Sequence, residues 1–401
     1  MTSLAVNEVP VDVLKDISDH CIEHFKYQQL SLVLEKWYLP SFHLSSSSDN
    51  RLNYCNLIKQ QEDVNLWDQQ RHRRQLKNKT VQTFFKKFSQ ILIEGSTRIN
   101  TIDLRNYPLN IKFLEDTIRE LSTSRCPLKI IIDLSLTEQD IDSRRLVNNT
   151  GTLTITVRNL FFYLETDTCL CHETLVEYFK TLFDNPVYDF TNLECVQLST
   201  IDLRRVLATR GELQILDELK QLLSTSRSLR TIDLSYNAIN INGDDGRSLR
   251  VLHNFLSSFP KLKRLDLSGN RLQNYLAALL KDNLQLEYLN IGGSQLRQID
   301  VSFLSSLTSL KHLDLSNNNL SNKLNVLKSA LSCLQSLEIL EMESCGLSPD
   351  CYYEVQPYLR KLTSLRAINL QYNNLSRTKI NLNCISYTKD DYEDDDDEYE
   401  V

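Results

Sequence analysis

Glycine is scarce in this chain, which has only 9 glycines among 401 residues. Loops that cradle phosphate groups need glycine where the backbone approaches the ligand, and none of the common nucleotide-binding motifs occurs. The motifs of zinc metalloproteases and of serine hydrolases are missing as well. The sequence therefore predicts a protein that is not an enzyme and that uses no cofactor.

The ten cysteines are scattered along the chain and form no paired clusters. Cys169, Cys171 and His172 lie close together, but no second pair of ligands follows that would complete a zinc site. His312 and Asp314 alternate along one predicted strand without a nucleophile beside them, so we expect a surface pair rather than a catalytic one. We predict no metal site, and reduced thiols of the kind found inside cells.

Long hydrophobic runs are also lacking, and the first ten residues have neither the basic nor the apolar region of a signal peptide. We expect no membrane partner, and a cytoplasmic location with the nucleus as a second compartment. The basic run at residues 71–79 has two interpretations, a solvated linker or a patch for nuclear import or nucleic acid. We favour the linker, so nucleic acid is not an expected partner.

The net charge of −7 comes from one end of the chain. Nine of the 52 acidic side chains lie between Asp390 and Glu400, with Lys389 beside them, so residues 1–388 hold 44 basic and 43 acidic groups. A segment of like charges with few apolar residues repels itself and cannot form a core. We predict a disordered acidic tail at 381–401, which either solubilises the protein or binds a basic partner.

One pattern occurs six times in the second half of the chain. Each copy has aliphatic residues at positions 1, 4 and 6 and a polar residue at position 9. The copies start at Leu229, Leu262, Leu286, Leu310, Leu337 and Leu365, and position 9 holds Asn237, Asn270, Ser294, Asn318, Cys345 and Asn373. This is the leucine-rich-repeat consensus, in which a short strand and a turn form one coil of a solenoid. The asparagine amide can satisfy backbone groups that are left free where the strand ends.

The segments between these strands have helical spacing of apolar residues, and weaker copies of the strand pattern lie farther upstream. Strands are expected at 130–134 and 153–157, and helices around 81–92, 114–121, 175–182, 216–223, 249–259, 324–334 and 349–362. The predicted fold is an α/β leucine-rich-repeat solenoid, a horseshoe with parallel strands on its concave face, helices on its convex face and an N-terminal helical cap. We assign residues 1–44 to the helical pair, 45–80 to a polar segment and 81–380 to the solenoid, irregular to about 228 and regular over 229–380.

Positions 3 and 5 of each copy flank the buried position 4, so they point to the concave face. We predict that this face binds a protein partner through charges and an aromatic anchor. The candidate residues are Asp233, Arg264, Asp266, Tyr288, Asn290, His312, Asp314, Glu341 and Asn369.

The first residues form two amphipathic helices, one opened by Pro10 and one ending at Leu39 and Pro40. The segment from Val9 to Ile17, together with Trp37 and the repeats that follow, resembles the start of the PRAME family of leucine-rich-repeat proteins. Members of that family are horseshoe-shaped adaptors. Several are substrate receptors of cullin-RING ubiquitin ligases that contain elongin, and others regulate transcription or innate signalling.

The resemblance implies contacts with elongin and a cullin through the N-terminal helices. In one register, residues 9–17 with Pro10 and Leu14 match the segment associated with the cullin. In a second register, Ile17, Cys21 and Phe25 form an elongin box, and Leu39 and Pro40 a cullin box. A plain helical cap on the solenoid explains the same apolar face, so adaptor box and cap stay as alternatives, and so do a ligase receptor and a ligase-independent scaffold.

Overall fold

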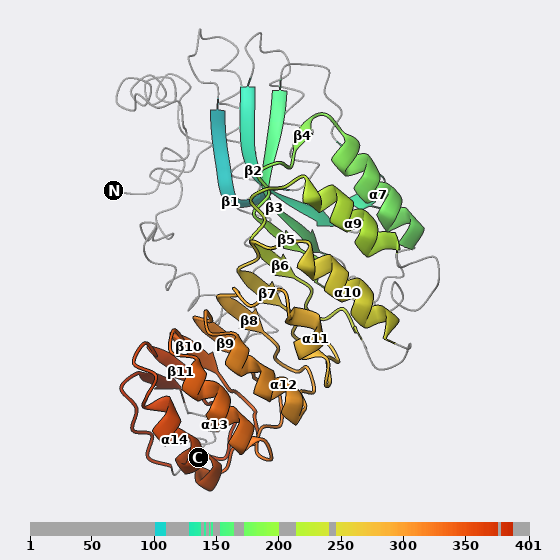
Figure 1. The fold of residues 1–401 in the computed structure, drawn as a ribbon. Coiled ribbons are helices and arrows are strands. Elements are labelled where there is room, and N and C mark those ends of the chain that lie inside the picture. Colours follow the sequence, from blue (N-terminus) through green and yellow to red (C-terminus); the bar gives the residue numbers. More distant parts are fainter. Residues whose placement is uncertain are drawn as a thin grey trace, which may run out of the picture. The chain divides into compact units, whose positions relative to one another are not determined.

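The computed structural model describes residues 101–109, 128–137, 140–141, 144, 146, 153–163, 172–199, 214–239, 246–375 and 378–387. Figure 1 shows the described helices and strands. The chain divides into two compact units. The first contains residues 1–136, 143–159 and 182–189, and the second contains residues 137–142, 160–181 and 190–401. The two predicted N-terminal helices, the polar segment at 45–80 and the predicted helices at 81–92 and 114–121 lie outside the described residues.

The described part of the first unit consists of long parallel strands rich in β-branched residues. Strand β1 (Thr101–Leu109) pairs with β2 (Leu128–Thr137), with an irregularity between Leu104 and Pro108. Strand β3 (Leu153–Tyr163) pairs with the short β4 (Tyr188–Asp189), where the Thr156 hydroxyl donates to Oδ2 of Asp189 over 3.2 Å. The strands predicted at 130–134 and 153–157 are thus confirmed, within β2 and β3.

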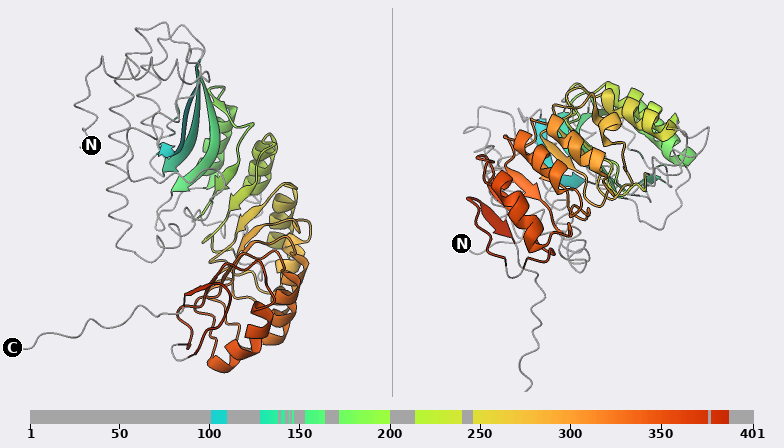
Figure 2. Two further views of the ribbon diagram at one scale, coloured as in Figure 1. Left: turned by 90° about the vertical axis from the view of Figure 1, so that its left-hand side faces the viewer. Right: turned by 60° about the horizontal axis from the view of Figure 1, so that its bottom comes forward.

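Eight short parallel strands follow one another in the described part of the second unit (Figure 2). They are β5 (Cys195–Gln197), β6 (Thr231–Asp233), β7 (Arg264–Asp266), β8 (Tyr288–Asn290), β9 (His312–Asp314), β10 (Ile339–Glu341), β11 (Ala367–Asn369) and β12 (Ile385–Tyr387). Equivalent repeat positions stand side by side, so Thr231 pairs with Arg264, and Tyr288 with His312. This regular register gives each position of the repeat its own row across the sheet.

Helices connect the strands and lie together on one side of this sheet (Figures 1 and 2). They are α7 (His172–Asp184), α9 (Gln214–Ser224), α10 (Arg247–Ser257), α11 (Leu276–Leu280), α12 (Gln298–Phe303) with the 3₁₀ helix η3 (Leu304–Ser306), α13 (Leu324–Cys333) and α14 (Pro349–Leu359). The helices predicted near 175, 216, 249, 324 and 349 are confirmed. In α14 the Ser348 hydroxyl accepts the N–H of Cys351, with Pro349 in the first turn, as the sequence predicts. None of the helices in the described ranges is long and apolar enough to cross a membrane.

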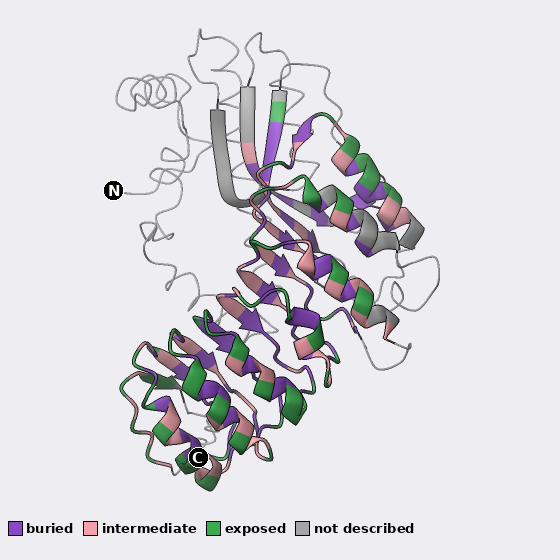
Figure 3. Cartoon of the chain, viewed as in Figure 1, coloured by how far each residue is buried: buried purple, intermediate pink, exposed green. Residues whose placement is uncertain are grey.

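Buried aliphatic residues form a continuous core between the strands and the helices (Figure 3). The middle residue of each strand from β6 to β11 is fully buried, and so is position 6 just after it, as with Leu265 and Leu267. Burial of one such side chain contributes about 1.5–3 kcal/mol, so the stacked coils stabilise one another. The predicted α/β leucine-rich-repeat solenoid is therefore the observed fold.

The asparagines at position 9 hold neighbouring turns together. The amide nitrogen of Asn270 donates to the carbonyls of Leu234 and Leu267, each over 2.9 Å, and its oxygen accepts the N–H of Ile239 over 3.0 Å. Asn318 and Asn373 repeat this arrangement. Cys345 substitutes with a weaker bond from its thiol to the Leu315 carbonyl, 3.3 Å long.

The end of the repeat array differs from the prediction. The sequence placed the start of the acidic tail at residue 381, but Ile385–Tyr387 forms β12 and pairs in parallel with β11. The N–H of Ile385 donates to the Arg366 carbonyl over 3.0 Å. An edge strand offers free backbone groups, so a short segment can join the sheet without the leucine pattern.

Candidate functional site

The face of the second unit's sheet opposite the helices carries two rows of side chains, because position 4 points inward and positions 3 and 5 therefore point outward. We call this surface the outer sheet face. Its position-3 row consists of Thr231, Arg264, Tyr288, His312, Ile339 and Ala367. Its position-5 row, the carboxylate row, consists of Asp233, Asp266, Asn290, Asp314, Glu341 and Asn369. All nine predicted partner-binding residues lie in these two rows.

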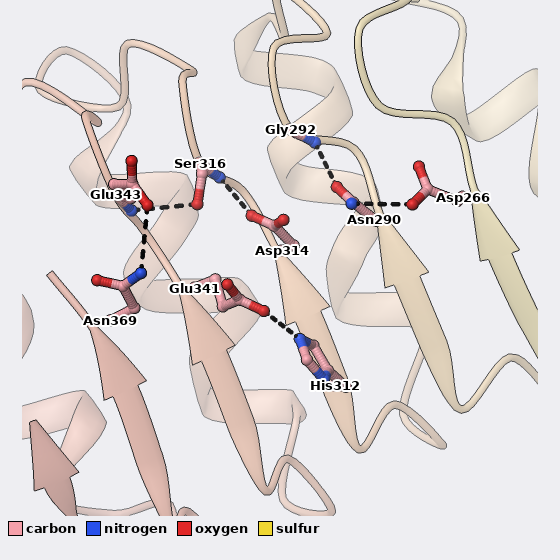
Figure 4. A network of polar contacts seen from close by, with 9 residues as sticks. All are labelled: Asp266, Asn290, Gly292, His312, Asp314, Ser316, Glu341, Glu343 and Asn369. Carbon is pink, nitrogen blue, oxygen red and sulfur yellow. Dashed lines mark hydrogen bonds and ion pairs between the residues drawn. The ribbon is translucent and has the colours of Figure 1, made fainter. Parts of the chain in front are cut away.

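Four side chains contact one another in succession across strands β7 to β10. The guanidinium carbon of Arg264 lies 4.4 Å from the centre of the Tyr288 ring, in cation–π geometry. The Tyr288 ring meets His312 edge-on at 4.9 Å between ring centres, and Nε2 of His312 lies 2.6 Å from Oε1 of Glu341 (Figure 4). We call Arg264, Tyr288, His312 and Glu341 the aromatic row. Each side chain is held by its neighbour, so the row has little conformational freedom to lose on binding.

The prediction of a His312–Asp314 surface pair is wrong. The two side chains share one face, but His312 is only 6% exposed and bonds to Glu341 on the next strand. Asp314 instead accepts the N–H of Ser316 over 2.8 Å. The register places Glu341 opposite Asp314 and therefore diagonally across from His312, where its long side chain still reaches the ring. The shorter Asp314 side chain is held by the turn that follows its own strand. Burial lowers the pKa of His312, and Glu341 acts against that shift.

The aspartates of the carboxylate row close the turn that follows their own strand. Asp266 accepts the backbone N–H of Ser268 over 2.9 Å and its hydroxyl over 2.7 Å, and the amide of Asn290 donates to its other oxygen over 3.0 Å (Figure 4). Asp233 accepts the N–H of Ser235 over 2.8 Å. These bonds fix the carboxylates in place and explain why the repeat favours aspartate at position 5.

Burial and mutual repulsion make these carboxylates hard to ionise. Burial raises the pKa of Asp266 to about 7, with the charge of Asp233 adding to the effect. Burial also raises the pKa of Asp314 to about 7, with contributions from Glu341 and Asp266. The pKa of Asp233 is raised by burial as well. Ionising the aspartates of the carboxylate row therefore costs free energy, and a cation placed over the row would reduce that free-energy cost.

Two features of this face were not predicted from the sequence. Glu343, at position 7, accepts the amide of Asn369 over 3.3 Å, and its N–H donates to the Ser316 hydroxyl over 3.2 Å. Tyr236, at position 8, is 60% exposed at the edge of the face. The sequence does show a large aromatic residue at this position, where the other copies have Gly, Asn, Ser or Tyr. The predicted binding residues, however, were taken only from positions 3 and 5.

Position 2, where each strand begins, carries a row of charged side chains that were not predicted to be functional. This position-2 row consists of Arg230, Lys263, Glu287, Lys311, Glu338 and Arg366. Glu287 bonds to Lys311 over 2.7 Å and to Lys263 over 3.1 Å, and Arg366 lies 3.5 Å from Glu338. The bond with Lys311 is the largest influence that lowers the pKa of Glu287. These exposed pairs contribute little stability each. They do neutralise the acidic groups at this edge of the sheet.

The proposed adaptor box, from Pro10 to Pro40, lies outside the described residues, as do Cys169 and Cys171. Within the described ranges, no group of three or more His, Cys, Asp or Glu side chains is placed to hold a metal ion. The cysteines at 333, 345, 351 and 384 are free thiols. Burial raises the pKa of Cys345 to about 12, so its thiol stays protonated in the core.

Comparisons with known proteins agree with the repeat pattern. The leucine rich repeat family model matches residues 260–320 and 284–347, and a second model of that description matches 225–246. A comparison with curated proteins gives no match. The leucine-rich repeat-containing protein LegL7 from Legionella pneumophila is 16% identical over 71% of this chain and 78% of that chain, with a TM-score of 0.38. An internalin, InlF, from Listeria monocytogenes is 14% identical over 73% of this chain and 92% of that chain, with a TM-score of 0.35. These two structural likenesses are too weak to carry an argument.

Proposed function

We propose that this chain, a leucine-rich-repeat protein, is a non-enzymatic adaptor that binds another protein through its outer sheet face. The observation that carries the proposal is the aromatic row. Tyr288 lies between Arg264 and His312, and aromatic residues and arginine are the side chains that most often dominate protein interfaces. The carboxylate row beside it supplies charges that can select the partner.

The finer proposal is that the adaptor delivers this partner for ubiquitination, with the N-terminal helices binding elongin and a cullin. Its support is the resemblance of residues 9–37 to the PRAME family. The alternative is a ligase-independent scaffold or regulator of signalling or transcription that uses the same face. In either case we propose a cytoplasmic protein that also enters the nucleus.

The test separates the two surfaces. Tyr288→Ala removes the central aromatic of the outer sheet face, and Tyr353→Ala, which removes a 50% exposed tyrosine from α14, is the matched control. Affinity purification with mass spectrometry should show that Tyr288→Ala loses the bound partner while Tyr353→Ala keeps it. Equal capture by both variants would contradict recognition through this face.

Ile17→Glu with Cys21→Glu tests the ligase proposal in the same experiment. Elongin and the cullin should be lost while the partner of the outer sheet face is retained. If the wild type captures neither elongin nor a cullin, the scaffold alternative replaces the ligase receptor. If the double substitution lowers the melting temperature of the repeats, the helix is a cap.

A further inference from the structure

The carboxylate row differs from the position-2 row in how its charges are balanced. Glu287 is paired with Lys263 and Lys311, and Glu338 with Arg366. Among the described residues, by contrast, no lysine or arginine forms an ion pair with Asp233, Asp266 or Asp314. The outer sheet face thus carries a group of fixed acids whose positive counterpart is not found in the described ranges.

The nearest bases on this face have other neighbours. Arg264 lies over the ring of Tyr288, and His312 bonds to Glu341. The raised pKa values of Asp266 and Asp314, both about 7, are attributed first to burial and then to other carboxylates. A cation brought in from outside would reduce the repulsion between the carboxylates and offset the cost of their burial by direct attraction, and it would be attracted by at least three carboxylates at once.

An exposed aromatic ring completes the surface. Tyr236 is 60% exposed, and its ring lies against Gly269, where an added Cβ would come within 2.5 Å of a ring atom. Burial raises the pKa of the Tyr236 hydroxyl, and Asp266, Asp314 and Asp233 raise it further, so the ring stands in the field of all three carboxylates. Carboxylates beside an open aromatic face suit a lysine or arginine side chain, which gains both ionic and cation–π contacts.

We propose that the outer sheet face docks a basic segment of its protein partner, with lysine or arginine side chains lying over Asp233, Asp266 and Asp314 beside Tyr236. The inference rests on the proposed function and adds the chemistry of the partner. Asp266 and Asp314 are two strands apart, about 10 Å. This is close to the span of about 9 Å of three residues in polyproline II conformation, in which side chains three residues apart lie on the same side. A segment with a basic residue at every third position therefore matches the spacing of Asp266 and Asp314. Nucleic acid does not fit, because its phosphates would be repelled.

The test uses the full chain and a synthetic peptide in which lysine occurs at every third position between small neutral residues. The same peptide with acetylated lysines lacks the charges, and spermidine supplies amines without a peptide. The site variant is Asp233→Asn with Asp314→Asn, because amide oxygens can still accept the N–H bonds from Ser235 and Ser316. The control variant is Asp184→Asn with Asp350→Asn, two exposed acids on α7 and α14, which changes the formal net charge by the same amount.

Isothermal titration calorimetry at low salt should show that the wild type binds the lysine peptide and not its acetylated form. The site variant should bind at least about tenfold more weakly, as expected for loss of charge-assisted contacts, while the control variant stays within about twofold. Equal weakening in both variants would mean attraction by overall charge, the acidic tail included, and would overturn the inference. So would absence of binding to the wild type, or binding of spermidine as tight as that of the peptide.

A second variant tests the same surface in case the site variant does not fold. Tyr236→Asn removes the exposed ring, and asparagine tolerates the left-handed φ of 53° at this position. It should weaken peptide binding about three- to tenfold without changing the melting temperature. The proposed function and the proposed basic segment can fail separately. Suppose that Tyr288→Ala abolishes capture of the cellular partner while the site variant and Tyr236→Asn capture it fully. The outer sheet face then binds a partner, but that partner is not basic.

Discussion

His312 and Glu341 lie on neighbouring strands, and Nε2 of the histidine is 2.6 Å from Oε1 of the glutamate (Figure 4). The side chains are only 7% and 12% exposed, so the bond is shielded from water. Burial lowers the pKa of His312, which favours a neutral ring that donates its Nε2 proton at neutral pH. The charge of Glu341 is therefore left to act on Asp314, whose pKa it helps to raise.

The unfolding free energy should depend on pH through Asp314. Its pKa is about 7 in the folded chain against an ordinary value of 3.8, so the folded state holds this proton more tightly. Its contribution to stability is complete below about pH 4 and is lost as the pH rises through 7. Asp314→Asn stays neutral and should be more stable than the wild type by about 1–2 kcal/mol at pH 8, with little difference at pH 4. Urea unfolding at both pH values measures this, and the exposed Asp350→Asn should show no such change.

Burial of a charge in the core should disrupt the solenoid. Leu267 is fully buried between stacked coils, so Leu267→Asp should lower the free energy of unfolding by about 3–5 kcal/mol. Leu284 is 42% exposed, and Leu284→Asp should leave stability nearly unchanged. Thermal melting followed by circular dichroism compares the two. Similar melting temperatures would show that the inward assignment of position 6 is wrong.

The asparagine at position 9 should contribute more to the free energy of unfolding than its size suggests. Asn270→Ala removes bonds to the Leu234 and Leu267 carbonyls and to the Ile239 N–H, all of which are buried. Leaving these groups unpaired should cost about 2–4 kcal/mol. The exposed Asn254 on α10 is the control, since Asn254→Ala can gain slightly from the helix propensity of alanine. Denaturant midpoints with unchanged slopes would give both values.

Alanine substitutions at two glycines in left-handed conformation distinguish the effect of backbone strain from that of a steric clash. Gly269 has φ 67° and Gly293 has φ 61°, so alanine costs about 1–2 kcal/mol of strain at either position. An added Cβ at Gly269 also meets the Tyr236 ring, whereas at Gly293 the nearest atoms are 3.8 Å away. Gly269→Ala should therefore destabilise more and shift the ring resonances of Tyr236 in NMR spectra. Identical effects of the two substitutions would argue against packing of the ring on Gly269.

The repeat sequence determined the secondary structure and the direction in which each strand residue points. Leucine at fixed positions defines both the buried row and, by alternation, the exposed rows, so β6 to β11 and the nine residues of the outer sheet face followed from spacing alone. Ser348 and Pro349 likewise marked the start of α14 through local capping. Such features depend on neighbours in the chain, which a sequence displays directly.

Contacts between repeats were decided only by the tertiary structure. His312 could have faced Asp314 on its own strand, and its bond to Glu341, 29 residues away, depends on the register of β9 and β10. The raised pKa values of Asp266 and Asp314 likewise need the spacing and burial of several strands. Strand β12 joined the sheet through backbone groups, which leave no side-chain pattern. Pairing across strands and burial both depend on residues that are distant in sequence, so composition and spacing cannot specify them.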